Sequence, residues 1–370
     1  MEKDLRFKIA LTFAEGVGGI MFRHLVAHFG SAEAVLSAPT ERLIKMQGIG
    51  HKTASQVKKS VKFLEQADTI LGEATKQGVR LLSYQSAGYP QRLKSLYDCP
   101  PILYSNGTAD FNALRTVGIV GTRNATEAGK EVTRKIVEGL AKLNVTVVSG
   151  LAYGIDIEAH RAAIQNDLPT IAVLANGIDV VYPAVHRKYI PEILNNGGLL
   201  TESSFGMQPI RQQFLARNRI IAGLSDAVVV VESAAKGGSL VTAEFANNYH
   251  REVFAVPGAI DSKFSEGTNT LIKRNKAQIF TGVKDIIEQL NWDIDNPNAR
   301  ASNIEKEIDW SRFSDDESKV LRLLHEKTEM LIDNLSFESG VPLNRLAALL
   351  LNLEFQDLVK VLPGKKFRLR

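Results

Sequence analysis

Cysteine is almost absent from this sequence, since Cys99 is the single thiol in 370 residues. One thiol cannot build a disulfide framework or a cysteine-based metal site, so both are excluded. Such low cysteine usage is typical of proteins in a reducing cytoplasm. We expect neither a metal ion nor another cofactor.

Long apolar runs are also missing. The strongest run, residues 227–231, is bounded by Asp226 and Glu232. It falls far short of the roughly 18 residues that a membrane helix needs, and it predicts a buried strand instead. The N-terminus has no apolar segment of the kind found in secretory signals. We therefore expect a cytoplasmic protein with no membrane partner.

A strong charge of either sign is lacking as well. The net charge is +4 and the isoelectric point is near 8.9. This mildly basic balance permits a nucleic-acid partner without requiring one. Apolar residues make up 44% of the chain, which is enough for a large core. The length suggests about two or three domains.

Glycine turns and polar breaks divide the chain into five segments. We expect a helical domain (1–75), an extended connector (76–115), a central α/β domain (116–291), a polar linker (292–308) and a winged-helix domain (309–370). The connector is expected to contain one strand, inside 78–85.

The last segment has the order of a winged helix. Ser314 is expected to cap its first helix, two later helices break at Gly340, and two strands turn at Pro363 and Gly364. The helix from Leu343 takes the recognition position. It has few side chains that read base edges, which favours packing or protein contact over base readout.

The central segment alternates strands with helices. This rhythm predicts an α/β domain with a doubly wound, mostly parallel sheet. The candidate strands are 117–120, 146–149, 170–174, 198–201, 227–231 and 253–256. Such sheets bind ligands beyond the carboxyl ends of their strands, and the unusual residues of this sequence follow those ends.

The first of these turns is Gly121–Thr122–Arg123, between the strand 117–120 and a helix expected over 127–143. Backbone N–H groups at a helix start, together with the Arg123 guanidinium, suit a phosphate. The turn lacks the Gly-x-Gly-x-x-Gly pattern of dinucleotide sites, and strand–turn–helix units also occur without a ligand. Phosphate binding and a purely structural turn are equal alternatives here.

Aromatic and basic residues follow the third strand. The Tyr182 ring can stack on a base, while His186, Arg187 and Lys188 can meet phosphates. The alternative is a helix start with a surface charge cluster.

Three arginines follow the fourth strand. Arg211, Arg217 and Arg219 are interleaved with aromatic residues, a pattern that suits single-stranded nucleic acid. At least one of these arginines is instead a candidate buried partner for Glu202 or Glu232, because the guanidinium fork serves both uses.

A second glycine loop follows the fifth strand. Lys236, Gly237, Gly238 and Ser239 precede a helix and form a second candidate phosphate cradle. The order Gly-Lys-Ser/Thr of the P-loop is absent.

Two further features have competing interpretations. Asp156 and His160 invite a catalytic role, but no matched nucleophile is evident, which favours Asp156 as a helix cap and His160 as a structural histidine. Near the N-terminus, Gly48-Ile49-Gly50 before a helix resembles the hairpin of helix-hairpin-helix modules. A small helical bundle whose hairpins only pack is the alternative.

Six motifs in order carry a specific resemblance. They are "GIVGTRNAT", "SGLAYGIDIEAHRAA", "GIDVVYP", "FLARNRIIAGLSDAVVVVE", "KGGSLVTAEFA" and "VFAVPG". In this order they are similar to the DNA-processing protein A family (DprA, also called Smf). The likeness is strong over about residues 85–280 and weaker in the helical (helix-hairpin-helix or SAM-like) N-terminal part and the winged-helix tail.

The resemblance implies an extended Rossmann-like domain that binds single-stranded DNA without catalysis. It also implies protection of incoming strands, loading of the recombinase RecA onto them in natural transformation, and a homodimer. The positions that match the family's DNA pocket are Arg123, His186–Lys188, Arg211 and Lys236. The family's self-association surface matches residues 260–272, with Ile260, Leu271 and Ile272 as candidate contacts.

Two alternatives come from other functional classes. The stretch "KGGSLVTAEFA" resembles a loop of the lysine-decarboxylase-like nucleotide phosphoribohydrolases, in which Glu244 would act as the acid or base. The flanking modules have no role in such a hydrolase. A transcription factor that acts through the winged helix is the third hypothesis.

Overall fold

The computed structural model describes residues 4–292, 313–327, 329–356, 358–362 and 364–369. The chain divides into two units, residues 1–283 and 284–370. The predicted linker lies outside the described residues, apart from Trp292. Within the described ranges, no helix has the length and apolar character needed to cross a membrane.

A nine-stranded sheet forms the centre of the first unit. Its strand order is β1-β2-β6-β5-β4-β3-β7-β8-β9. Every pair from β6 to β9 is parallel, whereas β1 and β2 pair antiparallel. The strands are β1 (Arg80–Ser83), β2 (Ile102–Gly107), β3 (Thr116–Val120), β4 (Thr146–Ser149), β5 (Thr170–Val173), β6 (Gly197–Thr201), β7 (Ala227–Val230), β8 (Glu252–Ala255) and β9 (Gln278–Ile279). The predicted doubly wound fold is confirmed, and each of the six predicted central strands is found within one residue at either end.

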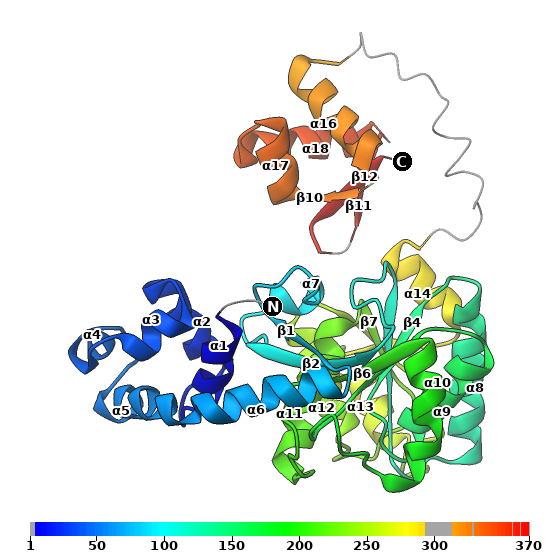
Figure 1. The fold of residues 1–370 in the computed structure, drawn as a ribbon. Coiled ribbons are helices and arrows are strands. Elements are labelled where there is room, and N and C mark those ends of the chain that lie inside the picture. The colour runs from blue at the N-terminus through cyan, green and yellow to red at the C-terminus, as the bar shows by residue number, and fades with distance from the viewer. Residues whose placement is uncertain (1–3, 293–312, 328, 357, 363, 370) are drawn as a thin grey trace. The chain divides into compact units, whose positions relative to one another are not determined.

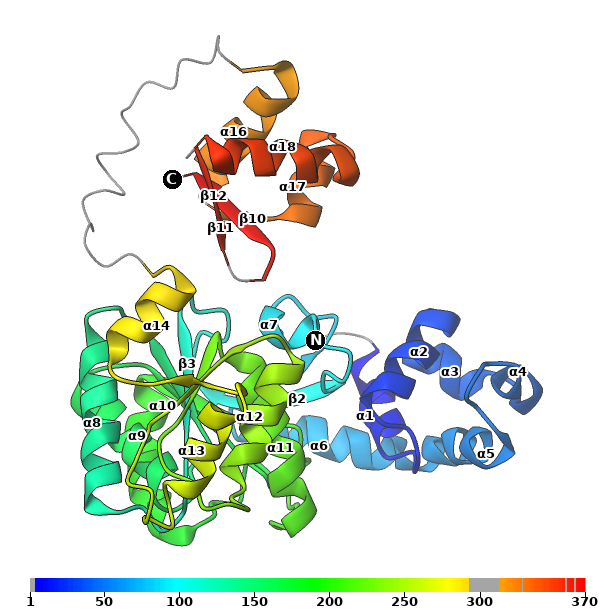
Figure 2. The ribbon, with the colours of Figure 1, turned by 180° about the vertical axis from the view of Figure 1, so that it is seen from behind.

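Helices cover both faces of this sheet (Figure 1, Figure 2). One face carries α8 (Glu127–Ala141), α9 (Ile155–Gln165) and α10 (Ile190–Asn195), and the other carries α11 (Arg211–Leu224), α12 (Ser239–Asn248) and α13 (Glu266–Lys273). Strand residues alternate between two cores: Ala172 belongs to one, Ile171 and Val173 to the other. Because the chain leaves β3 towards β4 and later returns to β7 on its other side, the switch point lies between β3 and β7.

The stretch expected to be an extended connector is part of the sheet. β1 is the predicted strand, but β2 was not predicted, and it pairs antiparallel with β6. The short helix α7 (Gln91–Lys94) stands between the two strands. Pro100 and Pro101 directly before β2 hid this strand in the sequence, although a proline is tolerated where a strand begins.

Short helices form the N-terminal part. They are α1 (Leu5–Thr12), α2 (Gly19–Phe29), α3 (Ala32–Ser37), α4 (Thr40–Ile44), α5 (His51–Lys59), η1 (Ser60–Phe63) and α6 (Leu64–Lys76). Their apolar side chains belong to the same core cluster as Tyr104 and Leu174 of the sheet domain. The helices and the sheet therefore form one body, in which α6 leads directly to β1 (Figure 1).

The second unit contains the winged helix. Its elements are α16 (Asp315–Lys327), β10 (Glu329–Leu331), α17 (Ile332–Ser339), α18 (Leu343–Phe355), β11 (Val359–Leu362) and β12 (Lys366–Leu369), after α14 (Val283–Leu290) at the start of the unit. As predicted, α17 and α18 break at Gly340. The Ser314 N–H donates to Glu317 Oε2 at 2.9 Å, and Ser314 Oγ accepts from the Glu317 N–H at 3.4 Å, which is a capping box. β10 was not predicted; it completes a three-stranded sheet of order β10-β12-β11.

An ion pair ties α7 to the sheet. Arg92 Nε and Nη2 donate to the two carboxylate oxygens of Asp226 at 2.7 and 2.9 Å, and both side chains are mostly buried. Asp226 Oδ2 also accepts from the backbone N–H of Thr116 at 2.9 Å. One carboxylate therefore joins α7 to the beginnings of β3 and β7.

We expect Asp226→Asn to destabilise the first unit by about 2–3 kcal/mol, because it leaves a mostly buried guanidinium without its counter-charge. Calorimetric unfolding of the full chain measures this loss. Lys135→Gln removes an exposed helix ion pair with Glu131 and serves as the control, with an expected effect below about 0.5 kcal/mol. Equal losses of stability in the two variants would contradict a stabilising role for the Arg92–Asp226 ion pair.

Candidate nucleic-acid interface

The turn after β3 is held between two neighbouring segments. A Cβ on Gly121 would lie 2.4 Å from the Ile155 side chain, so only glycine fits here. The Thr122 N–H donates to the Glu232 carbonyl at 2.8 Å, and the Thr122 carbonyl accepts from the Ile155 N–H at 3.2 Å. The amide of Thr122 is therefore already paired, and the exposed side chain of Arg123 is what this turn presents.

A carboxylate of the protein occupies the start of α8. Glu232 Oε2 accepts from the Thr126 N–H at 3.0 Å, and Glu232 Oε1 accepts from the Thr126 hydroxyl at 2.5 Å. Thr126 in turn caps α8 by accepting from the Gly129 N–H at 3.0 Å. A Cβ on Gly129 would lie 2.3 Å from the Glu232 carboxyl carbon, so the fit is close. The anion site expected at this helix start is filled by Glu232, which corrects the hypothesis of a phosphate cradled there.

Aromatic rings connect this turn to two other segments. The Arg123 guanidinium carbon lies 5.0 Å from the centroid of the Phe214 ring. That ring meets the Tyr182 ring edge-on at 5.7 Å between centroids. Tyr182 is 41% exposed. The β3 turn, the loop before η2 (Ala184–Tyr189) and the start of α11 thus meet in one cation–aromatic platform, made of Arg123, Phe214 and Tyr182.

One face of α11 organises the surrounding residues. Arg211, Phe214 and Asn218 follow one another at helical spacings of three and four residues, which places them on the same side of the helix. Arg211 is exposed at the first position. Asn218 Nδ2 donates to the Gly238 carbonyl at 3.3 Å, which connects α11 to the loop that carries Lys236. α11 therefore links the predicted sites around Arg123, Tyr182, Arg211 and Lys236.

Arg217 points into the protein, contrary to its predicted contact with DNA. It is 4% exposed, and its Nη1 donates to the Gly150 carbonyl at 2.7 Å and to the Val173 carbonyl. Burial lowers the pKa of Arg217 to about 10, although nearby Asp156 opposes this shift. Burial likewise raises the pKa of Asp156, against the attraction of Arg217. Arg217 thereby joins the carboxyl ends of β4 and β5.

Arg219 is also committed inside the protein. It donates to the Asp98 carbonyl at 2.7 Å and pairs with the Glu202 carboxylate. The alternative that one arginine is a partner for Glu202 is thus confirmed, and Arg219 leaves the set of DNA contacts. A sequence pattern of arginines cannot reveal this division, because Arg217 and Arg219 lie on nearly opposite sides of α11 and each is buried by a different segment that packs there.

The cluster after Tyr182 divides in the same way. His186 is 5% exposed, and its Nδ1 lies 2.8 Å from the Leu151 carbonyl oxygen. Burial lowers the pKa of His186, so this residue is a neutral packing residue and not a phosphate contact. Arg187 and Lys188 are exposed. Tyr153, which the sequence analysis missed, is 46% exposed, and its ring lies 5.2 Å from the His186 ring. Its position between strand-end glycines was the available signal.

The second glycine loop has fewer unpaired groups for a phosphate than the sequence predicted. The Gly237 N–H donates to the Ala234 carbonyl at 3.0 Å, and the Ser239 hydroxyl donates to Ser233 Oγ at 3.0 Å. Ser239 is 7% exposed. These groups maintain the loop, while the Lys236 side chain and Gly238 remain exposed.

Asp156 and His160 have structural positions. His160 is fully buried, with Nδ1 2.7 Å from Thr170 Oγ1. Burial lowers its pKa to about 3, so the ring is neutral. The structural interpretation of His160 is confirmed. Asp156, however, is not the helix cap: Gly154 takes that position, and Asp156 is bonded by the backbone of Ala152 and Gly150.

The candidate dimer residues differ in exposure. Ile260 is 99% exposed. Leu271 is 7% exposed and packs in the sheet's own core, which contradicts a role for it at an interface. Ile272 is half-buried beside that core and lines a hollow of about 520 Å³ together with Ile279 of β9.

No metal centre competes with this arrangement in the part of the chain that the structure describes. There, His, Cys, Asp and Glu side chains form no group of three that could hold a metal ion.

Comparisons with known proteins agree on one family. The family model for DNA recombination-mediator protein A matches residues 80–291, and the model for the DprA winged helix domain matches residues 305–365. A protein called Smf from Synechocystis is 36% identical over 286 residues, which are 76% of this chain and 71% of that protein.

Two solved structures are also similar. DNA processing protein A from Streptococcus pneumoniae superposes with a TM-score of 0.67 at 30% identity, over 77% of this chain and 97% of that chain. DNA processing protein A from Helicobacter pylori, studied for its unique single-stranded DNA binding mode, gives a TM-score of 0.52 at 32% identity, over 58% of this chain and 96% of that chain.

The buried His160 predicts a pH dependence of stability. The unfolded chain binds a proton at His160 below its ordinary pKa of 6.5, whereas the folded chain does so only near 3. Its contribution is therefore complete above about pH 6.5 and is lost as the pH falls towards 3. Between pH 7 and pH 5 we expect a loss of about 2 kcal/mol.

Urea unfolding of the wild type and of His160→Gln at both pH values measures this loss. The quantity compared is the difference between the two pH values within each protein, so a general destabilisation by the substitution does not matter. We expect the pH difference to be about 2 kcal/mol smaller in His160→Gln. An identical pH difference in both proteins would contradict the buried neutral ring.

Proposed function

Because this chain belongs to the DNA recombination-mediator protein A family, we propose that it binds single-stranded DNA at the carboxyl edge of its central sheet. The observation that carries the proposal is the platform in which Arg123 stacks on Phe214 and Phe214 meets Tyr182. Single strands are bound by stacking bases on aromatic rings while cations follow the phosphates, and the platform offers both. The single-stranded DNA binding described for the H. pylori relative supports the same assignment.

The strand would be held by side chains more than by backbone amides. Arg123, Arg211 and Lys236 are exposed, and the contacts of α11 bring them to one edge, with Arg187 and Lys188 on the neighbouring loop. The amides of Thr122 and Gly237 are already paired within the protein. Such a surface recognises phosphates and ring faces, which every nucleotide has, so binding should depend strongly on salt and little on sequence.

We propose that the protein acts by binding and not by catalysis. The helix start that would hold a nucleotide phosphate is filled by Glu232. Asp156 and His160 are buried and paired inside the protein, and Glu244 lies exposed on α12. These positions favour the DNA mediator over the phosphoribohydrolase hypothesis.

The resemblance to the family extends the proposal to partners. We propose that the bound strand is protected and handed to RecA recombinase in the cytoplasm during natural transformation, and that two copies associate through the loop that carries Ile260. The support for the second point is that this loop holds a fully exposed isoleucine at 99% exposure, beside the half-buried Ile272.

The DNA site predicts a specific loss on substitution. We expect Arg123→Ala/Lys236→Ala to weaken binding to an oligo-dT strand and to reduce the slope of log affinity against log salt by about 1.4, or about 0.7 for each lost phosphate contact. Phe214→Ala should cost about 1–3 kcal/mol through lost stacking. Fluorescence anisotropy over a salt series measures both effects.

The matched controls are Lys135→Gln for the cations and Tyr97→Ala for the ring, since Tyr97 is 57% exposed and contacts Tyr249 away from the platform. Wild-type affinity in both site variants would remove the basis of the proposal. A RecA strand-loading assay on the same variants then tests whether loading depends on strand binding.

The self-association proposal has a separate test. We expect Ile260→Glu to weaken the dimer about tenfold or more, because it places a charge in an apolar contact. Sedimentation equilibrium measures the dissociation constant. Leu114→Glu, at another exposed apolar position, is the control and should leave it unchanged. A dimer of unaltered strength in Ile260→Glu would refute this surface.

A further inference from the structure

An acid-free basic stretch covers part of the N-terminal helices. No Asp or Glu occurs between Glu41 and Glu65, a stretch that contains six lysines and arginines and one histidine. It covers most of α4, the following hairpin, α5 and η1. The whole chain has a net charge of only +4, so this stretch alone carries more positive charge than the protein as a whole. Such a concentration indicates a polyanionic partner.

Three of these cations form a stripe. Lys52, Lys59 and Lys62 are exposed and lie seven and three residues apart, on one face of the helical path through α5 and η1. The junction residue Ser60 keeps helical backbone angles, so the two elements continue in register. No acidic residue of the stretch itself lies on this face; one carboxylate from outside it, Glu15, accepts from Gln56 Nε2 at 3.1 Å, and Gln56 stands between Lys52 and Lys59 on α5.

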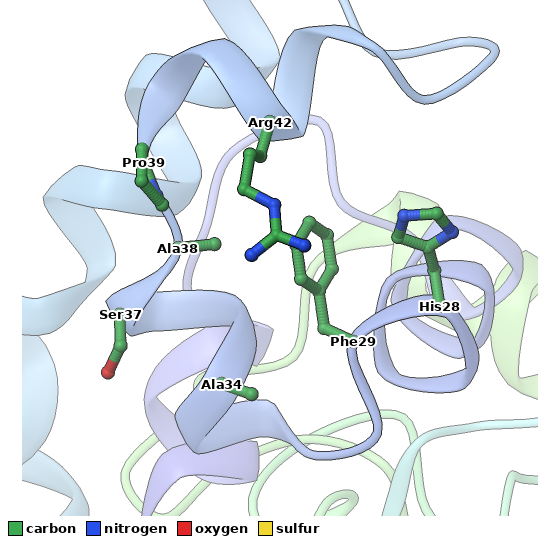
Figure 3. A pocket seen from close by; sticks show the side chains of 7 residues that line it. All are labelled: His28, Phe29, Ala34, Ser37, Ala38, Pro39 and Arg42. Atoms are coloured by element: carbon green, nitrogen blue, oxygen red, sulfur yellow. The ribbon is translucent and has the colours of Figure 1, made fainter.

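Of the other cations of the stretch, Lys58 is bonded elsewhere, while Arg42 and Lys45 are exposed outside the stripe. Lys58 donates to the carbonyls of Leu36 and Ala38. Arg42 points towards Phe29 across a hollow of about 370 Å³ that is bordered by α2, α3 and α4 (Figure 3).

The stripe begins at an open hairpin. Gly48 has a φ of 85°, and Gly50 caps α5 with extended backbone angles and without any side-chain cap. Between them Ile49 is 4% exposed and anchors the hairpin in the core. A Cβ added to Gly50 would meet nothing within 4 Å. The first amides of α5 are therefore accessible next to Lys52.

An earlier hairpin provides an internal comparison. Gly16 has a φ of 81°, Gly18 caps α2 with nearly the same angles as Gly50, and Val17 is 9% exposed between them. A Cβ on Gly18 would meet nothing within 4 Å, as at Gly50, and the two hairpins differ at the next residue: a Cβ on Gly19 would lie 2.7 Å from the Cys99 carbonyl oxygen, whereas its counterpart His51 is exposed. The first hairpin is thus packed against the segment before β2, whereas the second, with the same backbone, is left open to a ligand.

We propose that the hairpin surface, defined as Gly48, Gly50, Lys52, Lys59 and Lys62, binds the sugar–phosphate backbone of duplex DNA. Cations and exposed amides recognise phosphates without regard to sequence. The one aromatic ring of this stretch, Phe63, is half-buried against Phe13 and lies under Lys62, whose Nζ is 4.9 Å from the ring centroid, so this surface offers no open ring on which an unpaired base can stack. It differs in this respect from the platform of Arg123, Phe214 and Tyr182. Both surfaces belong to one body, which suits DNA that has duplex and single-stranded parts.

The first test neutralises the stripe. Full-length Lys52→Gln/Lys59→Gln/Lys62→Gln is compared with Lys76→Gln/Lys94→Gln/Lys135→Gln, which removes three exposed lysines of other elements. Anisotropy titrations use a blunt duplex and an oligo-dT strand over a salt series. We expect the stripe variant to lose about 2.7 from the duplex log–log salt slope, or about 0.9 for each contact. Its oligo-dT affinity should change less than about twofold, since the platform is intact.

The second test uses the hairpin itself. Gly50→Asp introduces a favourable helix cap that also places a carboxylate at the amides. We expect an unchanged or higher melting temperature together with duplex binding at least about tenfold weaker, because the carboxylate repels phosphate. Gly50→Asn has the same shape without the charge and should weaken binding less. This pair separates charge from folding.

The proposal is overturned if the wild type binds no duplex at low salt, if the stripe variant binds duplex like the wild type, or if both triple variants lose equally. It is also overturned if the stripe variant keeps duplex binding but loses binding to phosphatidylglycerol vesicles. Failure of the single-strand proposal would appear separately, in the oligo-dT affinity of Arg123→Ala/Lys236→Ala.

Discussion

The bonding of Glu232 at the switch point of the sheet determines what this domain can bind. Its carboxylate follows β7, accepts from the backbone and hydroxyl of Thr126, and lies at the positive end of α8. Doubly wound folds usually receive an anionic ligand in this place. Because the Glu232 carboxylate is the anion at this helix start, a side chain of the protein takes the place of a ligand. The exposed Arg123 next to it is then available to something that passes over the edge instead of entering it.

Helix α11 makes contacts on two opposite sides, one at the surface and one at the strand ends. Its outer side presents Arg211 and places Phe214 beneath Arg123, while its inner side sends Arg217 to the carbonyls at the ends of β4 and β5. A buried guanidinium costs free energy unless its hydrogen bonds are satisfied, and Asp156 and the two carbonyls reduce that cost. The same helix therefore joins the strand ends on one side and carries the exposed cation and the aromatic ring of the proposed site on the other.

The sequence was a good guide wherever a local pattern controls the structure. The six central strands and the break between α17 and α18 follow from hydrophobic periodicity and turn residues. β2 and β10 were missed because their strand character depends on distant partners, β6 and β12. At the candidate site, Arg123, Tyr182, Arg211 and Lys236 are exposed, so their contact with DNA stays a prediction, whereas Arg217 and His186 are buried and Arg219 is paired inside the protein. Residue type alone does not distinguish a cation that meets solvent from one that pairs inside.

The sequence by itself determined the family, the alternation of strands and helices in the central domain, and the edge of the sheet where the unusual residues gather. These features depend on neighbours along the chain, whose spacing is visible in one dimension. Only the tertiary structure decided which of those residues are exposed there and which are paired inside the protein. It placed Glu232 against Thr126, turned Phe214 towards Arg123, and left one of two similar glycine hairpins open while Cys99 covered the other. Those outcomes depend on contacts between residues far apart in sequence, and such contacts are fixed only when the whole chain packs.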